Sequence, residues 1–167
     1  MALMLSGGLE DTICAIATPA GEGGIGIVRL SGARALAVAE SIVRLRSGRP
    51  LALIASHTLH LADVRLPSSF KSVETADLGV GDVCDEALVV YMKGPRSFTG
   101  EDVVEIQSHG GALILSLVCR ACVAAGARLA TPGEFSKRAF FNGRLDLSQA
   151  EAVLDAIRAK SAASLSA

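Results

Sequence analysis

Apolar residues along this chain form short β-branched runs that alternate with longer stretches of helical spacing. Strands are predicted at Thr12–Thr18, Ile25–Leu30, His57–Arg65, Glu86–Met92, Asp102–Gln107 and Ala127–Ala130. Helices are predicted at about Ala33–Arg44 and Ala112–Ala125, where apolar residues recur every three or four positions. The stretch Pro67–Gly81, rich in Ser, Gly and Asp, is predicted to be a surface loop.

Residues with strong positional preferences mark the predicted helix ends. Ser31 is expected to cap the first helix, and Gly126 is expected to end the second in a left-handed conformation. Thr131 and Glu134 fit a capping box that opens a third helix, which should end near Asn142 and Gly143. A second box, Ser148 with Glu151, predicts a last helix whose apolar side carries Val153, Leu154, Ile157 and Leu165. That helix has no stop signal before residue 167, so we expect a piece of a longer protein or an apolar side that a partner covers.

Composition narrows the classes of protein that fit. The chain has 167 residues, half of them apolar, which suits one compact domain and a small appendage. A net charge of −1 argues against binding nucleic acid by bulk electrostatics, and an aromatic share of 4% argues against a stacking platform for single strands. No apolar run is long enough to span a membrane, no signal peptide is evident, and the four cysteines look like core residues. We therefore expect a cytoplasmic protein.

Several segments match the sequence motif of a functional site, but the secondary structure predicted around them does not fit that site. Gly21–Gly26 matches the dinucleotide-binding pattern, yet a strand rather than a helix follows it, so a glycine-rich hairpin is the better interpretation. Cys119 and Cys122 lie late in a predicted helix, where packing is expected instead of redox chemistry. No metal site is expected, because no second Cys or His pair stands at ligand spacing. No P-loop motif occurs, so this chain alone should not hydrolyse GTP.

Three ionic residues stand in places that charged residues usually avoid. Arg29 and Glu105 each interrupt an apolar strand, and Arg144 follows Gly143 at a predicted helix end. A buried charge without a partner is costly, so a position inside a strand can indicate a binding site. Alternation leaves a second interpretation open, in which both residues simply face water on the outer side of a sheet.

Three long segments carry a resemblance to a known family. Asp11–Gly32, Gly94–Gly111 and Pro132–Val153 closely resemble, in this order, signature segments of the bacterial tRNA-modification GTPase family MnmE, also called TrmE. The stretch from Arg44 to Val83 carries almost none of the resemblance.

The resemblance implies an α/β (α+β) fold with a mixed sheet, of the tetrahydrofolate-binding, aminomethyltransferase type. Residues 1–145 would form this folate-binding and dimerisation domain, and residues 146–167 would be the first helix of a helical domain that holds the GTPase domain in the family. The implied cofactor is a 5-formyl- or methylene-tetrahydrofolate. GTP, Mg²⁺ and K⁺ would belong to the absent GTPase domain.

The implied partners are a second copy of the chain and, through the full-length protein, tRNA and the FAD-dependent protein MnmG (GidA). Together these modify carbon 5 of the tRNA wobble uridine. The family's folate contacts fall on Arg29, Glu105 and Arg144, although many members have Lys where this chain has Arg144. A carboxylate suits the N–H edge of a pterin, and guanidinium groups suit its carbonyl or its anionic tail. No catalytic residue is implied for this part of the protein.

Two other functions remain open at this point. One is a free-standing folate-dependent one-carbon transferase that uses Glu105 or Asp102 as a general acid or base. The other is a purely structural dimerisation domain that binds no ligand.

Overall fold

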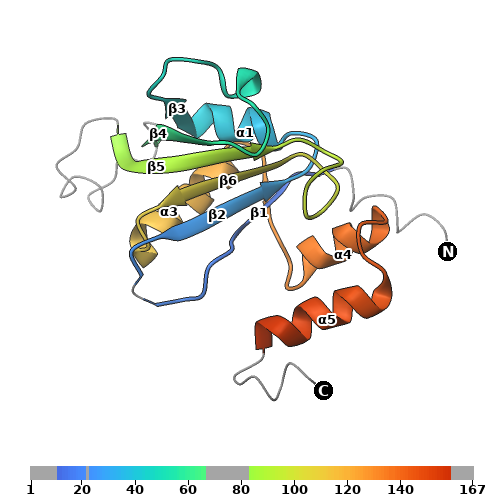
Figure 1. Ribbon diagram of the computed structural model, residues 1–167. Helices are drawn as coiled ribbons and strands as arrows, with labels where there is room; N and C mark the ends of the chain where they lie inside the picture. The colour runs from blue at the N-terminus through green and yellow to red at the C-terminus, as the bar shows by residue number, and fades with distance from the viewer. Residues whose placement is uncertain (1–10, 22, 67–82, 159–167) are drawn as a thin grey trace.

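The computed structural model describes residues 11–21, 23–66 and 83–158, which form one sheet and its covering helices (Figure 1). The strands are β1 (Ile13–Ile16), β2 (Gly26–Ser31), β3 (Val43–Leu45), β4 (Leu59–Arg65), β5 (Val83–Met92), β6 (Val103–Ser108) and β7 (Arg128–Leu129). The helices are α1 (Ala35–Ile42), α3 (Ala112–Ala124), α4 (Glu134–Phe141) and α5 (Leu147–Arg158), with a 3-10 turn η1 (Leu51–Leu53).

The sheet has seven strands in the order β3-β4-β5-β6-β2-β1-β7. Its pairs are antiparallel except for β1 with β7, which run parallel. The mixed sheet and its helices confirm the α/β (α+β) class. The central strands β6 and β2 come from distant parts of the chain, so residues far apart in the sequence meet in the middle of the sheet.

The main core lies between one face of the sheet and the helices α1 and α3, which stand behind the sheet in Figure 1. Alternate residues of each strand point into this core, as the period-two pattern predicts. The strand residues in this core include Val28, Leu30, Val89, Tyr91, Val104 and Ile106. The opposite face carries the residues in between, Arg29 and Glu105 among them. We call it the open face.

The first helix begins later and ends earlier than the sequence predicts. Ser31 is not its cap but the last residue of β2, and it is fully buried. The helix starts at Ala35, after Arg34, without a side-chain cap. The stretch from Val43 leaves the helix to pair with β4, because a β-branched residue can gain a buried edge-strand position there.

The starts of α4 and α5 differ from the two capping boxes that the sequence predicts. Helix α4 begins at Glu134 and not near Pro132, and the carboxylate of Glu134 accepts a bond from the backbone N–H of Thr131 at 2.7 Å. Helix α5 is capped by Asp146, whose Oδ1 accepts from the N–H of Gln149 at 2.8 Å, while Gln149 returns a bond to the N–H of Asp146. The box predicted at Ser148 is therefore shifted by two residues, to Asp146 and Gln149, which are also capping-box residue types.

The glycine hairpin between β1 and β2 packs closely on its neighbours. Gly26 begins β2, so the dinucleotide-binding interpretation is excluded, as the sequence predicts. A Cβ atom on Gly110 would lie 2.2 Å from the carbonyl oxygen of Gly23. The hairpin and the turn before α3 therefore touch backbone to backbone.

Cys119 and Cys122 pack in the core, as the sequence predicts. Both are buried, and Cys14 Sγ lies 3.9 Å from Cys119 Sγ. The pKa of Cys119 is raised by its hydrogen bond to Cys14 and by burial, which keeps the thiol protonated. Gly126 has a φ of 103°, the left-handed conformation predicted for it. The predicted loop Pro67–Gly81 and the apolar residue Leu165 lie outside the described residues.

Candidate functional site

Arg29 and Glu105 form a cross-strand ion pair in the middle of the open face. They are directly opposite each other in the register of β2 and β6. Arg29 Nε donates to Glu105 Oε1 at 2.8 Å, and Arg29 Nη2 lies 2.7 Å from the same oxygen. The side chains are 28% and 13% exposed. Within the described residues, no hydrogen bond reaches Glu105 Oε2, so this oxygen can accept from a ligand.

Two phenyl rings cover the guanidinium of Arg29. Its Cζ lies 5.9 Å from the ring centre of Phe98 and 5.7 Å from that of Phe135. Phe98 comes from the loop between β5 and β6, and Phe135 comes from the first turn of α4. The rings attract the cation and exclude water from one side of the pair. A flat ligand at Glu105 would meet aromatic and cationic surface together.

Arg144 contacts the loop that carries Phe98. Its Nε donates to the carbonyl oxygen of Ser97 at 2.9 Å, and its side chain lies against Gly100. The residue is exposed, so its remaining N–H groups face solvent. Among the described residues, no hydrogen bond or ion pair joins it to Arg29 or Glu105. The structure thus brings two of the three predicted residues into contact, while the third, which follows α4, is bonded to the loop that carries Phe98.

Asp102, the other acid considered for catalysis, is engaged in holding the fold. Its Oδ1 accepts from the N–H of Gly94 at 2.9 Å, and its Oδ2 accepts from the hydroxyl of Tyr91 at 3.0 Å. Burial, and then the bond to Asp102, raise the pKa of Tyr91 to about 12. Both carboxylate oxygens of Asp102 thus have structural partners.

A second ionic cluster lies beside the pair, at the start of α4. Arg128 Nη2 lies 2.7 Å from Glu134 Oε1, and Arg128 Nε donates to Asp11 Oδ2 at 2.7 Å. The bond from Arg128 is the main cause that lowers the pKa of Glu134 to about 2. The separate bond from Arg128 Nε to Asp11 is the first cause that lowers the pKa of Asp11. This cluster holds α4 against the edge of the sheet.

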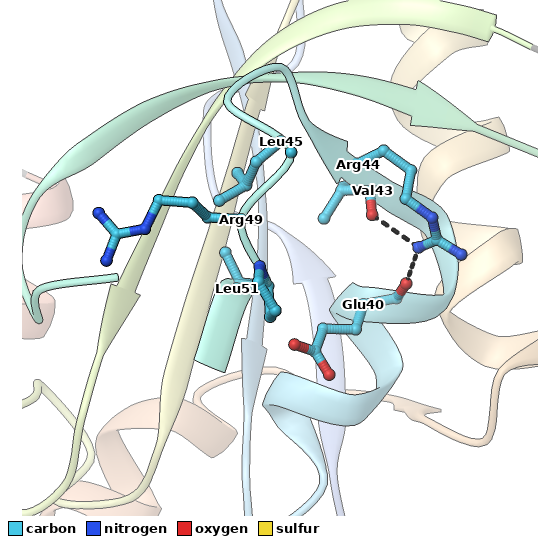
Figure 2. A pocket seen from close by; sticks show the side chains of 8 residues that line it. Glu40, Val43, Arg44, Leu45, Arg49 and Leu51 are labelled. Atoms are coloured by element: carbon cyan, nitrogen blue, oxygen red, sulfur yellow. Dashed lines mark hydrogen bonds between the residues drawn. The ribbon is translucent and has the colours of Figure 1, made fainter. Parts of the chain in front are cut away.

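A separate hollow of about 320 Å³ lies between α1 and η1, far along the sheet from the ion pair (Figure 2). Val43, Leu45 and Leu51 line it with apolar surface. Arg44 is turned back onto the end of α1, where its Nη1 donates to the carbonyls of Glu40 and Val43. These bonds cap the helix end. None of the predicted site residues lines this hollow, so it is not the candidate site.

Within the described residues, no group of three or more His, Cys, Asp or Glu side chains is arranged to hold a metal ion. No helix there is long and apolar enough to cross a membrane.

Sequence reasoning missed the residues that surround the ion pair. Phe98 and Phe135 stand inside the segments that carry the family resemblance, but no periodicity marks them as neighbours of Arg29. Arg138 is the largest fully buried side chain in the described residues. Its spacing of four from Glu134 could have indicated an ion pair on one helix face, but not its burial.

The fold and the site define a mixed α/β domain that presents an aromatic-covered ion pair on an open sheet face. Residues 12–144 match a family model described as "GTP-binding protein TrmE N-terminus". The chain therefore belongs to the TrmE family, as its N-terminal part.

Similar proteins agree with this assignment. The chain is 60% identical over 151 residues to a "tRNA modification GTPase MnmE" of Symbiobacterium thermophilum, which covers 90% of the chain and 30% of that protein. It is 52% identical over 157 residues to the protein with the same description in Carboxydothermus hydrogenoformans, covering 94% and 32%. For Chloroflexus aurantiacus the identity is 54% over 158 residues, covering 94% and 31%. The chain thus spans about a third of the length of these relatives.

Proposed function

We propose that this chain is the tetrahydrofolate-binding and homodimerising module of a tRNA-modification GTPase. The observation that carries the proposal is the ion pair of Arg29 and Glu105 on the open face, at the positions that the family resemblance indicates. A binding site explains why a strand centre holds two charges beside two phenyl rings. We propose that the fold is of the aminomethyltransferase type, with residues 1–145 as the folate domain and 146–167 as the start of a helical domain.

The donor set fits a reduced folate. A pterin edge presents adjacent N–H groups, and Glu105 Oε2 can accept from them while Oε1 keeps Arg29 in place. The ligand would be a 5-formyl- or methylene-tetrahydrofolate. Arg144, held by Ser97 with its outer N–H groups exposed, suits the carboxylates of the folate tail.

The wider role follows from the relatives' descriptions as tRNA modification GTPases. In the full-length protein we propose that GTP, Mg²⁺ and K⁺ bind in a separate GTPase domain. That protein would work in the cytoplasm with MnmG (GidA) on carbon 5 of the tRNA wobble uridine. This module would supply the folate site and the dimer contact.

The rival proposal of an independent transferase has weaker support. Asp102 is held by Gly94 and Tyr91, and Glu105 is held by Arg29. Both oxygens of Asp102 and one oxygen of Glu105 thus have structural partners, and we do not assign a catalytic residue.

Titration calorimetry with 5-formyltetrahydrofolate tests the proposal directly. We expect saturable binding with about one site per chain, since each chain has one Arg29–Glu105 pair on its open face. Absence of binding up to the solubility limit of the ligand would leave a structural dimerisation domain as the better interpretation.

A further inference from the structure

A buried guanidinium links α4 to the loop that covers the candidate site. Arg138 is 1% exposed and lies among three carboxylates. Its Nη2 is 2.5 Å from Asp11 Oδ1 and 3.3 Å from Glu134 Oε1, and its Nη1 is 3.2 Å from Glu101 Oε1. A buried charge is stable only with such partners, so the position of Arg138 is tightly determined.

Glu101 connects Arg138 to the sheet and to the Gly94–Gly100 loop. Its Oε2 accepts from Ser31 Oγ, the end of β2, at 2.6 Å. Because the proton of Ser31 goes to the carboxylate, the hydroxyl of Thr99 donates to Ser31, with 2.7 Å between the oxygens. Ser31 and Thr99 are both fully buried. The loop is therefore tied at Thr99 to the same carboxylate that holds Arg138.

Two more donors from the end of α4 reach the same loop. Asn142 Nδ2 donates to the carbonyl of Thr99 at 2.8 Å, and Arg144 Nε donates to the carbonyl of Ser97 at 2.9 Å. Phe98 lies between these two anchored residues. The backbone on both sides of Phe98 is therefore held by residues that follow α4. Phe135, in α4 itself, contacts the guanidinium of Arg29 directly, as Phe98 does.

We infer that Arg138 is a positioning residue of the Arg29–Glu105 site, and this inference rests on the proposed folate function. Arg138 acts through Glu101 on the Gly94–Gly100 loop, and through α4 on Phe135. The two rings then fix where the guanidinium of Arg29 stands over β2. A planar fork with several N–H groups is needed to reach three carboxylates at once, so Lys cannot replace Arg138 in this role.

The test compares Arg→Lys variants of two arginines that each pair with more than one carboxylate. Arg138→Lys breaks part of the link to Glu101, whereas Arg46→Lys disturbs the bonds to Asp63 and Glu86, which are partners neither of Arg138 nor of the loop. The first readout needs no ligand: the Nε–H resonance of Arg29 in a ¹⁵N–¹H NMR spectrum, assigned by its loss in Arg29→Lys. We expect it to shift in Arg138→Lys and to stay in place in Arg46→Lys. An unchanged resonance in Arg138→Lys, or an equal shift in both variants, overturns the inference.

The second readout is affinity for 5-formyltetrahydrofolate. Loss of a partner that orients a metal ligand commonly costs ten- to a hundredfold in affinity, and by the same reasoning we expect affinity about tenfold lower in Arg138→Lys. Arg46→Lys should bind as the wild type does. Absence of binding to the wild-type chain would contradict the proposed function, while the NMR comparison would still decide the role of Arg138.

A third variant covers the case in which Arg138→Lys does not fold. Thr99→Val keeps the volume of the side chain and removes the hydroxyl that ties the loop to Ser31. The same shift of the Arg29 resonance is expected. A folded Thr99→Val chain with an unmoved resonance and unchanged affinity would count against the positioning role.

Discussion

Glu105 shares a hydrogen bond with Arg29, and this changes what its substitution should do. From the sequence alone, Glu105 could be an under-paired charge whose removal leaves stability unchanged or raises it. In the structure it is one half of a partly buried ion pair. Exposed ion pairs contribute little to stability, whereas buried pairs are costly to break. The contribution of this partly buried pair lies between the two.

Glu105→Gln should therefore weaken both ligand binding and the fold. The amide places N–H donors where the pterin edge also has donors, so affinity for 5-formyltetrahydrofolate should fall roughly ten- to a hundredfold. Stability should fall by about 1–2 kcal/mol, because Arg29 loses its charged partner. Calorimetry and urea unfolding measure the two effects.

Glu86→Gln is the matched control. Glu86, on β5, pairs with Arg46, the residue after β3, but its side chain is 49% exposed. The variant should bind folate normally and change stability by less than about 0.5 kcal/mol. If Glu105→Gln behaved as this control does, Glu105 would be an ordinary surface residue.

His109 should make stability depend on pH. Its Nδ1 lies 2.7 Å from Asp85 Oδ1, and this hydrogen bond is the main cause that raises the pKa of His109 above 6.5. A raised pKa means that the folded state binds the proton more tightly than the unfolded state. The stabilisation is fully present below pH 6.5 and is lost as pH rises through the folded-state pKa.

Thermal melts of wild type and His109→Gln across this range measure the effect. The difference in Tm should be largest in acid and should shrink as the pH rises. An Asp85→Asn chain should lack the same pH dependence, since the carboxylate is its cause. A difference that grew with pH would contradict the assignment of the pair.

At the scale of elements, the glycine hairpin and the turn before α3 depend on a close backbone contact. Gly110→Ala would place a Cβ 2.2 Å from the carbonyl oxygen of Gly23, and a backbone atom cannot rotate away. We expect a loss of about 1–3 kcal/mol in urea unfolding. Gly24→Ala, in the same hairpin, meets nothing within 4 Å and should cost far less. Equal losses in the two variants would show that the contact does not constrain the hairpin.

Element boundaries were predictable where the signal is local. The apolar runs identified β1, β2, β5 and β6 to within a few residues, and Gly26 was correctly assigned to a strand. Two local signals failed at helix starts. Ser31 is instead a buried hydroxyl bonded to Glu101, and α5 is capped by Asp146, two residues before Ser148. Both failures arise because one polar side chain competes for alternative partners.

At the scale of the whole molecule, the proposed homodimer is open to a direct measurement. The open face carries the exposed leucines Leu59, Leu61 and Leu88 on adjacent strands, apolar surface that a second copy could cover. Light scattering at micromolar concentration should give about twice the chain mass of 17.1 kDa. A weak dissociation constant is compatible with a module that spans a third of its relatives. A strict monomer at every concentration would contradict the dimer.

The sequence by itself determined the family, the mixture of strands and helices, and the unusual charges at Arg29 and Glu105. These features depend on residues that are close together in the chain, and period-two and helical patterns report them directly. The glycine pattern and the cysteine pair were also interpreted correctly from their neighbours alone.

Only the tertiary structure decided which residues meet. Arg29 and Glu105 are 76 positions apart, and the register of β2 with β6 makes them partners. The two rings over Arg29 and the burial of Arg138 depend on where α4 packs. Strand register and helix docking depend on contacts between distant segments, which no local pattern encodes.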